Sequence, residues 1–236
     1  MSRADVPAPL DVALVLKRTV RAFVDDFAGV VLGGFALVML PGVATRAIAG
    51  DGEIGTLLTI VRAVCAMLYV ALVSWGVVSR LRGRALPSPV FLREGLARAQ
   101  PGLQVSLLAG AAVVIGLTIH LFARPGTLAG WMLNSLLLTG GLLAVCVLMP
   151  LVPAAVVERL GPIAAFRRAA ALTEGNRNRI LALALLAGLT LAPSAALVAG
   201  FAGNAGPWLT ALVELLAWSL AATLPAVVYA GLGDAP

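Results

Sequence analysis

Long apolar runs without charge alternate with short arginine-rich segments along the whole chain. The charge-free runs cover residues 27–45, 63–79, 99–123, 125–157, 180–213 and 215–233. A membrane-crossing helix takes about 17–25 apolar residues, and each run reaches that length. The short alternating strands of a transmembrane barrel are absent from the sequence. The pattern predicts an all-α, polytopic membrane protein.

Six transmembrane helices are expected, and the predicted spans are about 27–43, 55–79, 103–122, 128–157, 180–200 and 208–230. Three basic amphipathic segments precede pairs of spans and are predicted to be helices lying on the membrane surface, at about 10–26, 90–99 and 162–174. The third is the clearest, because Pro162 suits the first turn of a helix and Gly175-Asn176 suits its end. All residues, 1–236, are predicted to form a single integral membrane domain.

The amphipathic segments recur at similar spacing. Their centres, at Lys17-Arg18, Arg93 and Arg167-Arg168, lie 76 and 74 residues apart. The economical interpretation is a three-fold internal repeat of helix, span and span, inserted with one orientation. Small residues four apart predict a close helix contact in the first span of each unit: Gly29 with Gly33, Ser106 with Gly110, and Ala184 with Gly188.

Composition supports this class. Hydrophobic residues make up 61% of the chain and charged residues 12%, whereas about a quarter of a soluble chain is charged. A net charge of +6 suits nucleic-acid binding in a soluble protein, but the placement of the basic residues argues against it here. Alternate connections hold nearly all of them: Arg3, Lys17, Arg18, Arg21, Arg80, Arg82, Arg84, Arg93, Arg98, Arg159, Arg167, Arg168, Arg177 and Arg179.

Only Arg46 and Arg124 fall in the other connections, and Arg62 lies within a span. Because positive loops stay in the cytoplasm, both termini are predicted to be cytoplasmic. The preference for arginine over lysine is typical of a GC-rich bacterial genome, so the expected location is the bacterial inner membrane. Expected partners are membrane lipids, including anionic ones, and a protein of unknown identity, with no nucleic acid. The sequence leaves the oligomeric state open.

No catalytic signature is present in the sequence: it has no phosphate-binding loop, no nucleophile elbow and no zinc-protease motif. The single histidine has no carboxylate close to it in sequence. We therefore predict a non-enzymatic protein without cofactor or metal.

Two charges lie inside apolar runs. Arg62 and Glu214 each follow the outer end of a span by seven residues, which places both about 10 Å deep at 1.5 Å per residue. A lone charge there costs at least ~2.5 kcal/mol, so we predict an ion pair. His120 and Asn134 are predicted to belong to the same outer layer. The pair is either a structural contact or an outward-opening polar site, and we favour the structural role because one pair is enough for mutual neutralisation.

The surface helices also allow two interpretations. Lys17, Arg18, Arg93, Arg167 and Arg168 could contact lipid headgroups, since each basic residue near an anionic surface contributes about 1 kcal/mol. Alternatively, they only anchor the protein and fix its orientation, as the generality of positive cytoplasmic loops suggests.

Several short motifs resemble one known family. They are Pro153, Glu158, Gly161, Phe166-Arg167-Arg168, Leu172-Thr173 and Gly175-Asn176-Arg177, with Gly83-Arg84, the Pro87–Leu103 segment and Tyr229-Ala230-Gly231-Leu232. Together they resemble the membrane domain of bacterial glycerophosphoryl diester phosphodiesterases and its stand-alone six-span relatives. The resemblance implies a membrane fold. It implies no catalytic residue, because the soluble phosphodiesterase barrel has no counterpart in this sequence.

The resulting hypothesis is an accessory or scaffold protein for envelope or lipid processes. The alternative is a small carrier or channel that uses a polar site around Arg62 and Glu214. An intramembrane lipid enzyme is a third, less favoured interpretation.

Overall fold

The computed structural model describes residues 10–48, 53–122, 127–201 and 206–233, and every element in them is a helix. Five helical stretches in these residues are long and apolar enough to cross a membrane: 27–45, 54–81, 99–122, 128–158 and 211–233. The chain is therefore a helical membrane protein. Of the charges used above, Arg3, Arg124 and the side chain of Arg46 lie outside the described parts.

The helices, in chain order, are α1 (Val12–Asp25), α2 (Phe27–Gly34), a π-helical turn η2 (Phe35–Met39), α3 (Leu40–Ile48), α4 (Glu53–Leu81), α5 (Ser88–Ala97), α6 (Ala99–Phe122), α7 (Leu128–Glu158), α8 (Pro162–Thr173), α9 (Arg177–Phe201) and α10 (Gly206–Gly233). The short helices predicted at 10–26, 90–99 and 162–174 correspond to α1, α5 and α8.

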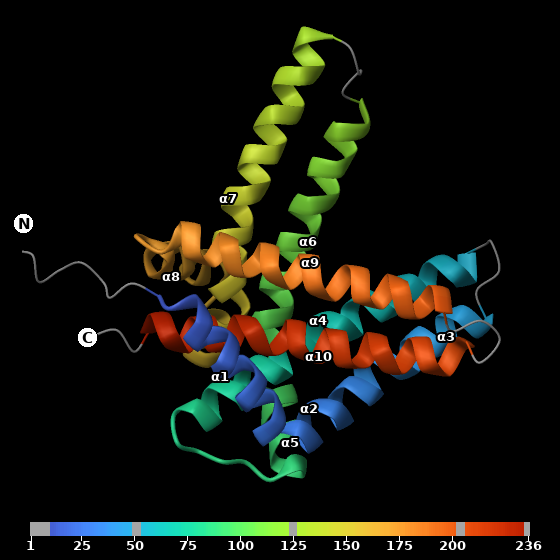
Figure 1. The fold of residues 1–236 in the computed structure, drawn as a ribbon, viewed down its shortest axis with the longest axis vertical. Coiled ribbons are helices and arrows are strands. Elements are labelled where there is room, and N and C mark those ends of the chain that lie inside the picture. The colour runs from blue at the N-terminus through green and yellow to red at the C-terminus, as the bar shows by residue number, and fades with distance from the viewer. Residues whose placement is uncertain (1–9, 49–52, 123–126, 202–205, 234–236) are drawn as a thin grey trace, which may run out of the picture.

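Three long helices form the centre of the molecule. α4, α7 and α10 contact one another, and each remaining long segment lies between two of them: α2–η2–α3 between α10 and α4, α6 between α4 and α7, and α9 between α7 and α10. The short helices pack on the same three, α5 on α4, α8 on α7 and α1 on α10. The first helix therefore closes the arrangement against the last (Figure 1).

The α6–α7 hairpin diverges from the rest of the molecule. In Figure 1 it projects away from α9 and α10, which run alongside each other. Its base is buried around Val105 and Leu151, whereas Leu121 and Trp131 towards its tip are 82% and 69% exposed. Such apolar exposure is unfavourable in water but suits contact with lipid chains.

Two Pro-Gly pairs lie inside helices, although such pairs commonly mark helix ends. The first span was predicted to end at about residue 43, but α3 continues through Pro41 and Gly42 to Ile48. Just before the proline, the π-helical turn lets the amide of Leu40 bond to the carbonyl of Phe35, five residues back. A local change of hydrogen-bond register of this kind is one way in which a helix accommodates a proline.

The second pair is Pro101-Gly102, between the predicted surface helix at 90–99 and the predicted span at 103–122. The break between the two helices falls at Arg98, and Pro101 lies in the first turn of α6. A proline is tolerated there because the first amides of a helix have no intrahelical acceptor. Glycines also let helices approach: Gly29 and Gly33 lie against Phe91 and Leu72, as predicted.

The other predicted small-residue contacts differ from this one. Gly110 lies in ordinary contact with Met67, and a Cβ on Gly188 would meet no atom within 4 Å. Close approach through glycine occurs where α5 docks and also elsewhere, since a Cβ on Gly34 would lie 2.4 Å from Leu215 of α10 and one on Gly102 would lie 2.6 Å from Val156 of α7.

The ring of Phe91 fixes α5 against the bundle. It is 1% exposed and fills a slot between Gly29 of α2 and Gly76 of α4. A Cβ added at Gly76 would lie 1.7 Å from Cε2 of this ring, a distance that no relaxed contact allows. The slot exists because position 76 has no side chain.

We predict that Gly76→Ala destabilises the protein by about 1–3 kcal/mol through overpacking against a buried ring. The measurement is thermal unfolding in detergent. Gly140→Ala is the matched control, because a Cβ there meets no atom within 4 Å and alanine favours a helix. Equal melting temperatures for Gly76→Ala and the wild type would contradict the described docking of α5.

Candidate functional site

The intramembrane ion pair predicted from the sequence is present. Nη2 of Arg62 on α4 lies 3.5 Å from Oε2 of Glu214 on α10, with side chains 35% and 28% exposed. Gly42 of α3 lies beside Arg62, since a Cβ there would be 3.9 Å from its Nε. In water such a pair contributes ~0–1 kcal/mol, but in hydrocarbon it offsets the cost of two separate charges.

A buried hydroxyl pair lies deeper between the same two helices. The hydroxyl of Tyr69 donates to Oγ of Ser219 at 2.8 Å and lies 3.2 Å from the carbonyl oxygen of Val30. Ser219 in turn donates to the carbonyl of Leu215. Tyr69 and Ser219 are both fully buried, so this cluster joins α2, α4 and α10 without a path to solvent.

His120 and Asn134, the two other residues predicted for the outer layer, contact each other. Nδ1 of His120 lies 2.8 Å from Oδ1 of Asn134 near the tip of the α6–α7 hairpin, and both residues are exposed. Figure 1 shows the tip of this hairpin far from the first turns of α4 and α10. The structure therefore does not bring His120 and Asn134 beside the Arg62–Glu214 pair, and a common depth of all four residues stays a prediction.

On the arginine-rich side, one carboxylate joins three helices. Oε1 of Glu158, the last residue of α7, accepts from Nε of Arg168 at 2.9 Å and from the hydroxyl of Tyr229 at 2.7 Å. Arg82 also reaches this hydroxyl. Arg159 then adopts a left-handed conformation, with φ 54°, that turns the chain towards α8.

A second ion pair holds the first span to α4. Asp26, the single residue between α1 and α2, is 5% exposed and pairs with Nε of Arg80 at 2.5 Å. Burial raises the pKa of the Asp26 carboxyl above its ordinary value, and the Arg80 guanidinium opposes this effect. A buried carboxylate without such a partner would be strongly unfavourable.

The start of α1 is held by the turn between α8 and α9. The amide of Leu10 donates to Oδ1 of Asn176 at 2.9 Å, and its carbonyl accepts from Nη1 of Arg179 at 2.7 Å. Asn176 is 3% exposed, and its neighbour Gly175 has a φ of 79°, which favours glycine. Both backbone groups of Leu10 are thereby satisfied by residues more than 160 positions away.

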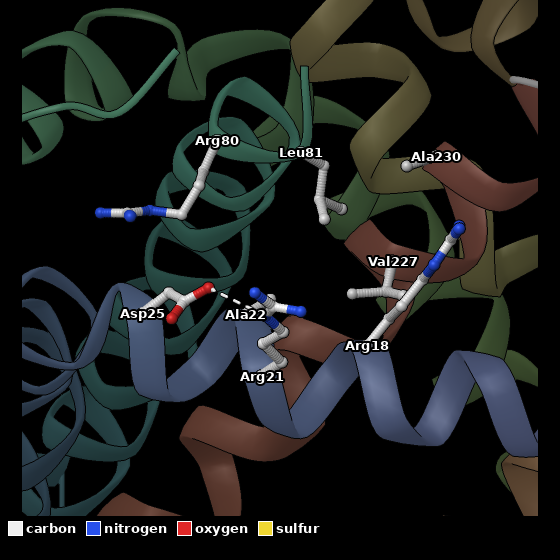
Figure 2. Close-up of a pocket in the computed structure, with 8 residues that line it drawn as sticks. All are labelled: Arg18, Arg21, Ala22, Asp25, Arg80, Leu81, Val227 and Ala230. Carbon is white, nitrogen blue, oxygen red and sulfur yellow. Dashed lines mark ion pairs between the residues drawn. The ribbon is translucent and has the colours of Figure 1, made fainter. Parts of the chain in front are cut away.

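The basic residues predicted to contact lipid headgroups have different surroundings in the structure. Lys17, Arg93 and Arg167 are exposed, whereas Arg168 is engaged with Glu158. Arg18 lines a pocket of about 380 Å³ between α1, α4 and α10. Figure 2 shows all the lining residues: Arg18, Arg21, Ala22, Asp25, Arg80, Leu81, Val227 and Ala230.

Sequence reasoning missed most of the contacts on the arginine-rich side. The signal that found Arg62 and Glu214, equal depth in two spans, was also available for Asp26 and Arg80 at the arginine-rich ends of their helices. Tyr229 was noted only for the family resemblance, and Asn176 only for that resemblance and as part of a helix-end signal. No sequence signal placed Leu10 beside Asn176, because that contact depends on how the first and last units meet.

In the described parts of the chain no three histidine, cysteine or acidic side chains gather in a way that could hold a metal ion. Comparison with protein-family models, curated proteins and solved structures gives no match to this chain. The contacts described above consist of polar side chains that join helices. A basic pocket lies on the arginine-rich side.

We predict that Asn176→Ala loosens α1. The buried amide of Leu10 would lose its acceptor at a cost of about 1–3 kcal/mol. Hydrogen–deuterium exchange over α1 should accelerate, while exchange in α4 stays unchanged. The control is Asn178→Ala, two residues away and exposed. Unchanged protection of α1 in Asn176→Ala would contradict the proposed hold on its first residue.

Proposed function

We propose that this chain is a non-enzymatic inner-membrane protein with an accessory or scaffold role in envelope or lipid processes. One observation carries the proposal: the polar side chains between helices are engaged with one another. Arg62 pairs with Glu214, Tyr69 with Ser219, Asp26 with Arg80, and Glu158 with Arg168 and Tyr229. Groups used in this way hold helices together, which is the central requirement of a scaffold.

The proposed architecture has six spans, which are the five long apolar stretches named above and α9. They form three units of helix, span and span. The contact pattern supports it, because each short helix packs on the last span of the preceding unit and α1 completes the cycle on α10. α1 also supports a surface position. Its buried face carries Val15, Thr19 and Ala22, while Leu16 and Val20 are exposed apolar residues.

We further propose that the arginine-rich side faces the cytoplasm of a bacterium and that both termini lie there. Kinship with the membrane domain of glycerophosphoryl diester phosphodiesterases is also a proposal. The residues that carry the resemblance support a structural reading of it, since Glu158 and Arg168 pair and Asn176 holds Leu10.

The alternative function is a carrier or channel centred on Arg62 and Glu214. The observation in its favour is the partial exposure of both side chains, 35% and 28%. A polar route across the membrane would need continuation inward from the pair, where the next polar side chains, Tyr69 and Ser219, are fully buried. The scaffold role therefore accounts better for the contacts.

Orientation is tested by labelling single cysteines in intact cells, on a background in which Cys65 and Cys146 are replaced. We predict that Arg84→Cys and Arg167→Cys react only after the membrane is permeabilised, whereas Gly126→Cys reacts from outside. The reason is that basic connections remain on the cytoplasmic side. Reaction of Arg84→Cys and Arg167→Cys from opposite sides would refute the three-unit arrangement.

The ion pair separates the two functions. If it is structural, Arg62→Gln and Glu214→Gln each lower the melting temperature in detergent, and the exchange Arg62→Glu with Glu214→Arg restores part of the loss. Each single variant should lose about 1–3 kcal/mol, because it removes the opposite charge that offsets the burial of the remaining one.

Ion and proton flux in proteoliposomes is measured on the same variants. Flux in the wild type that disappears in a well-folded Glu214→Gln protein would favour the carrier and contradict the scaffold. Wild-type vesicles as tight as protein-free vesicles would agree with the scaffold.

A further inference from the structure

We propose that the pocket between α1, α4 and α10 binds a phosphate group, with Arg18 and Arg21 as its ligands. This site deepens the proposed function, on which it rests, by naming a chemical class of ligand for one defined place. Nothing in the pattern of arginines along the sequence distinguishes Arg18 and Arg21 from the other basic residues of the surface helices.

Two arginine side chains of α1 line the pocket. Arg18 and Arg21 are three residues apart on α1, a spacing that places side chains on neighbouring positions of one face. In Figure 2 Arg18 reaches from α1 towards Val227 and Ala230, while Arg21 lies nearer to Asp25. Guanidinium groups match the oxygens of phosphate with paired hydrogen bonds, which favours phosphate over a halide.

The acidic residues near the pocket do not neutralise all of its arginines. Nε of Arg21 lies 3.8 Å from Oδ2 of Asp25, but these side chains are 82% and 45% exposed, so the attraction is weak. Arg80 is already engaged by Asp26 and contributes mainly its position in the wall. Arg18 has no ion pair among the residues that the structure describes. A dianion in the pocket would be attracted by the charges of both Arg18 and Arg21.

The size and the apolar walls of the pocket favour a ligand larger than a bare phosphate ion. Its volume of about 380 Å³ falls at the lower end of the range typical of small-ligand sites, about 300–1,000 Å³. Ala22, Leu81, Val227 and Ala230 provide an apolar wall beside the charged edge. A phosphate ester with a small organic group fits this combination better than inorganic phosphate alone.

Two sources could supply that chemistry. α1 carries the exposed apolar residues Leu16, Val20 and Val24 at four-residue spacing, on a different side from the pocket-lining residues. If these enter the bilayer, the pocket lies at headgroup height, within reach of an anionic phospholipid. The same pocket would also be open to a soluble phosphate compound from the arginine-rich side. The two sources are distinguished by experiment.

The test uses the full-length protein in an uncharged detergent. Binding of phosphatidylglycerol is measured by native mass spectrometry, with phosphatidylcholine as the reference lipid, and binding of inorganic phosphate by calorimetry. Arg18→Gln and Arg21→Gln should each weaken binding at least about tenfold. Asp25→Asn should strengthen it, because it removes a carboxylate that competes for Arg21. Lys17→Gln is the matched control, exposed on the same helix but outside the pocket, and should stay within about twofold.

Each outcome decides the proposal. Retention of phosphatidylglycerol that phosphate does not displace supports a lipid source, and displacement by phosphate supports a soluble one. Absence of both, or an equal loss in Lys17→Gln and Arg18→Gln, overturns the site. All the variants change exposed residues, and their melting temperatures show whether they remain folded. Failure here would leave the orientation and flux tests of the proposed function unaffected, so the two failures are distinguishable.

Discussion

Inside a bilayer no water is available to satisfy a polar group, and this constraint governs the polar contacts between the long helices. The hydroxyl of Tyr69 has Ser219 as its acceptor, and Arg62 has Glu214 as its counter-ion, both between α4 and α10. Arg62 precedes Tyr69 on α4, just as Glu214 precedes Ser219 on α10, and at similar spacing. The two helices therefore run in the same direction in nearly constant register. Polar groups that can be satisfied only by one another thus specify which helices are neighbours and how far each is shifted along the other.

Two carboxylates join helices on the arginine-rich side, whereas the α6–α7 hairpin projects away from α9 and α10 (Figure 1). Glu158 joins α7, α8 and α10, and Asp26 joins the start of α2 to α4. Away from these contacts the hairpin carries exposed apolar side chains, for which lipid is as good a neighbour as another helix. A hydrophobic driving force between helices is lacking in lipid, so helices remain together where polar pairs or close glycine contacts hold them, as at Phe91.

Much of the helical layout could be predicted from the sequence, because length, hydropathy and depth are properties of a single segment. Depth was enough to pair Arg62 with Glu214, since each is an isolated charge in its run. It was not enough to place His120, because depth gives no lateral position and the hairpin diverges. Proline is also an uncertain marker of helix ends in this sequence. A π-helical turn at Pro41 and a first-turn position at Pro101 make each proline compatible with a continuing helix. The hydrogen bond between Leu10 and Asn176 forms because the first helix packs against the last unit of the chain. No pattern of neighbouring residues in the sequence predicts such a contact.

α1 combines two properties that are physically linked. It closes the arrangement of helices, held at Leu10 by Asn176 and Arg179, and it carries Arg18 and Arg21 at the proposed phosphate site. The pocket is completed by Leu81 and Val227 from other helices, so it exists only while α1 is docked on α10. A ligand that binds only the docked state stabilises that state by mass action, to an extent set by its concentration relative to its dissociation constant. The proposed site would therefore couple anionic phosphate at the membrane surface to the closure of the whole bundle, which is a form of control that a scaffold can use without any catalytic group.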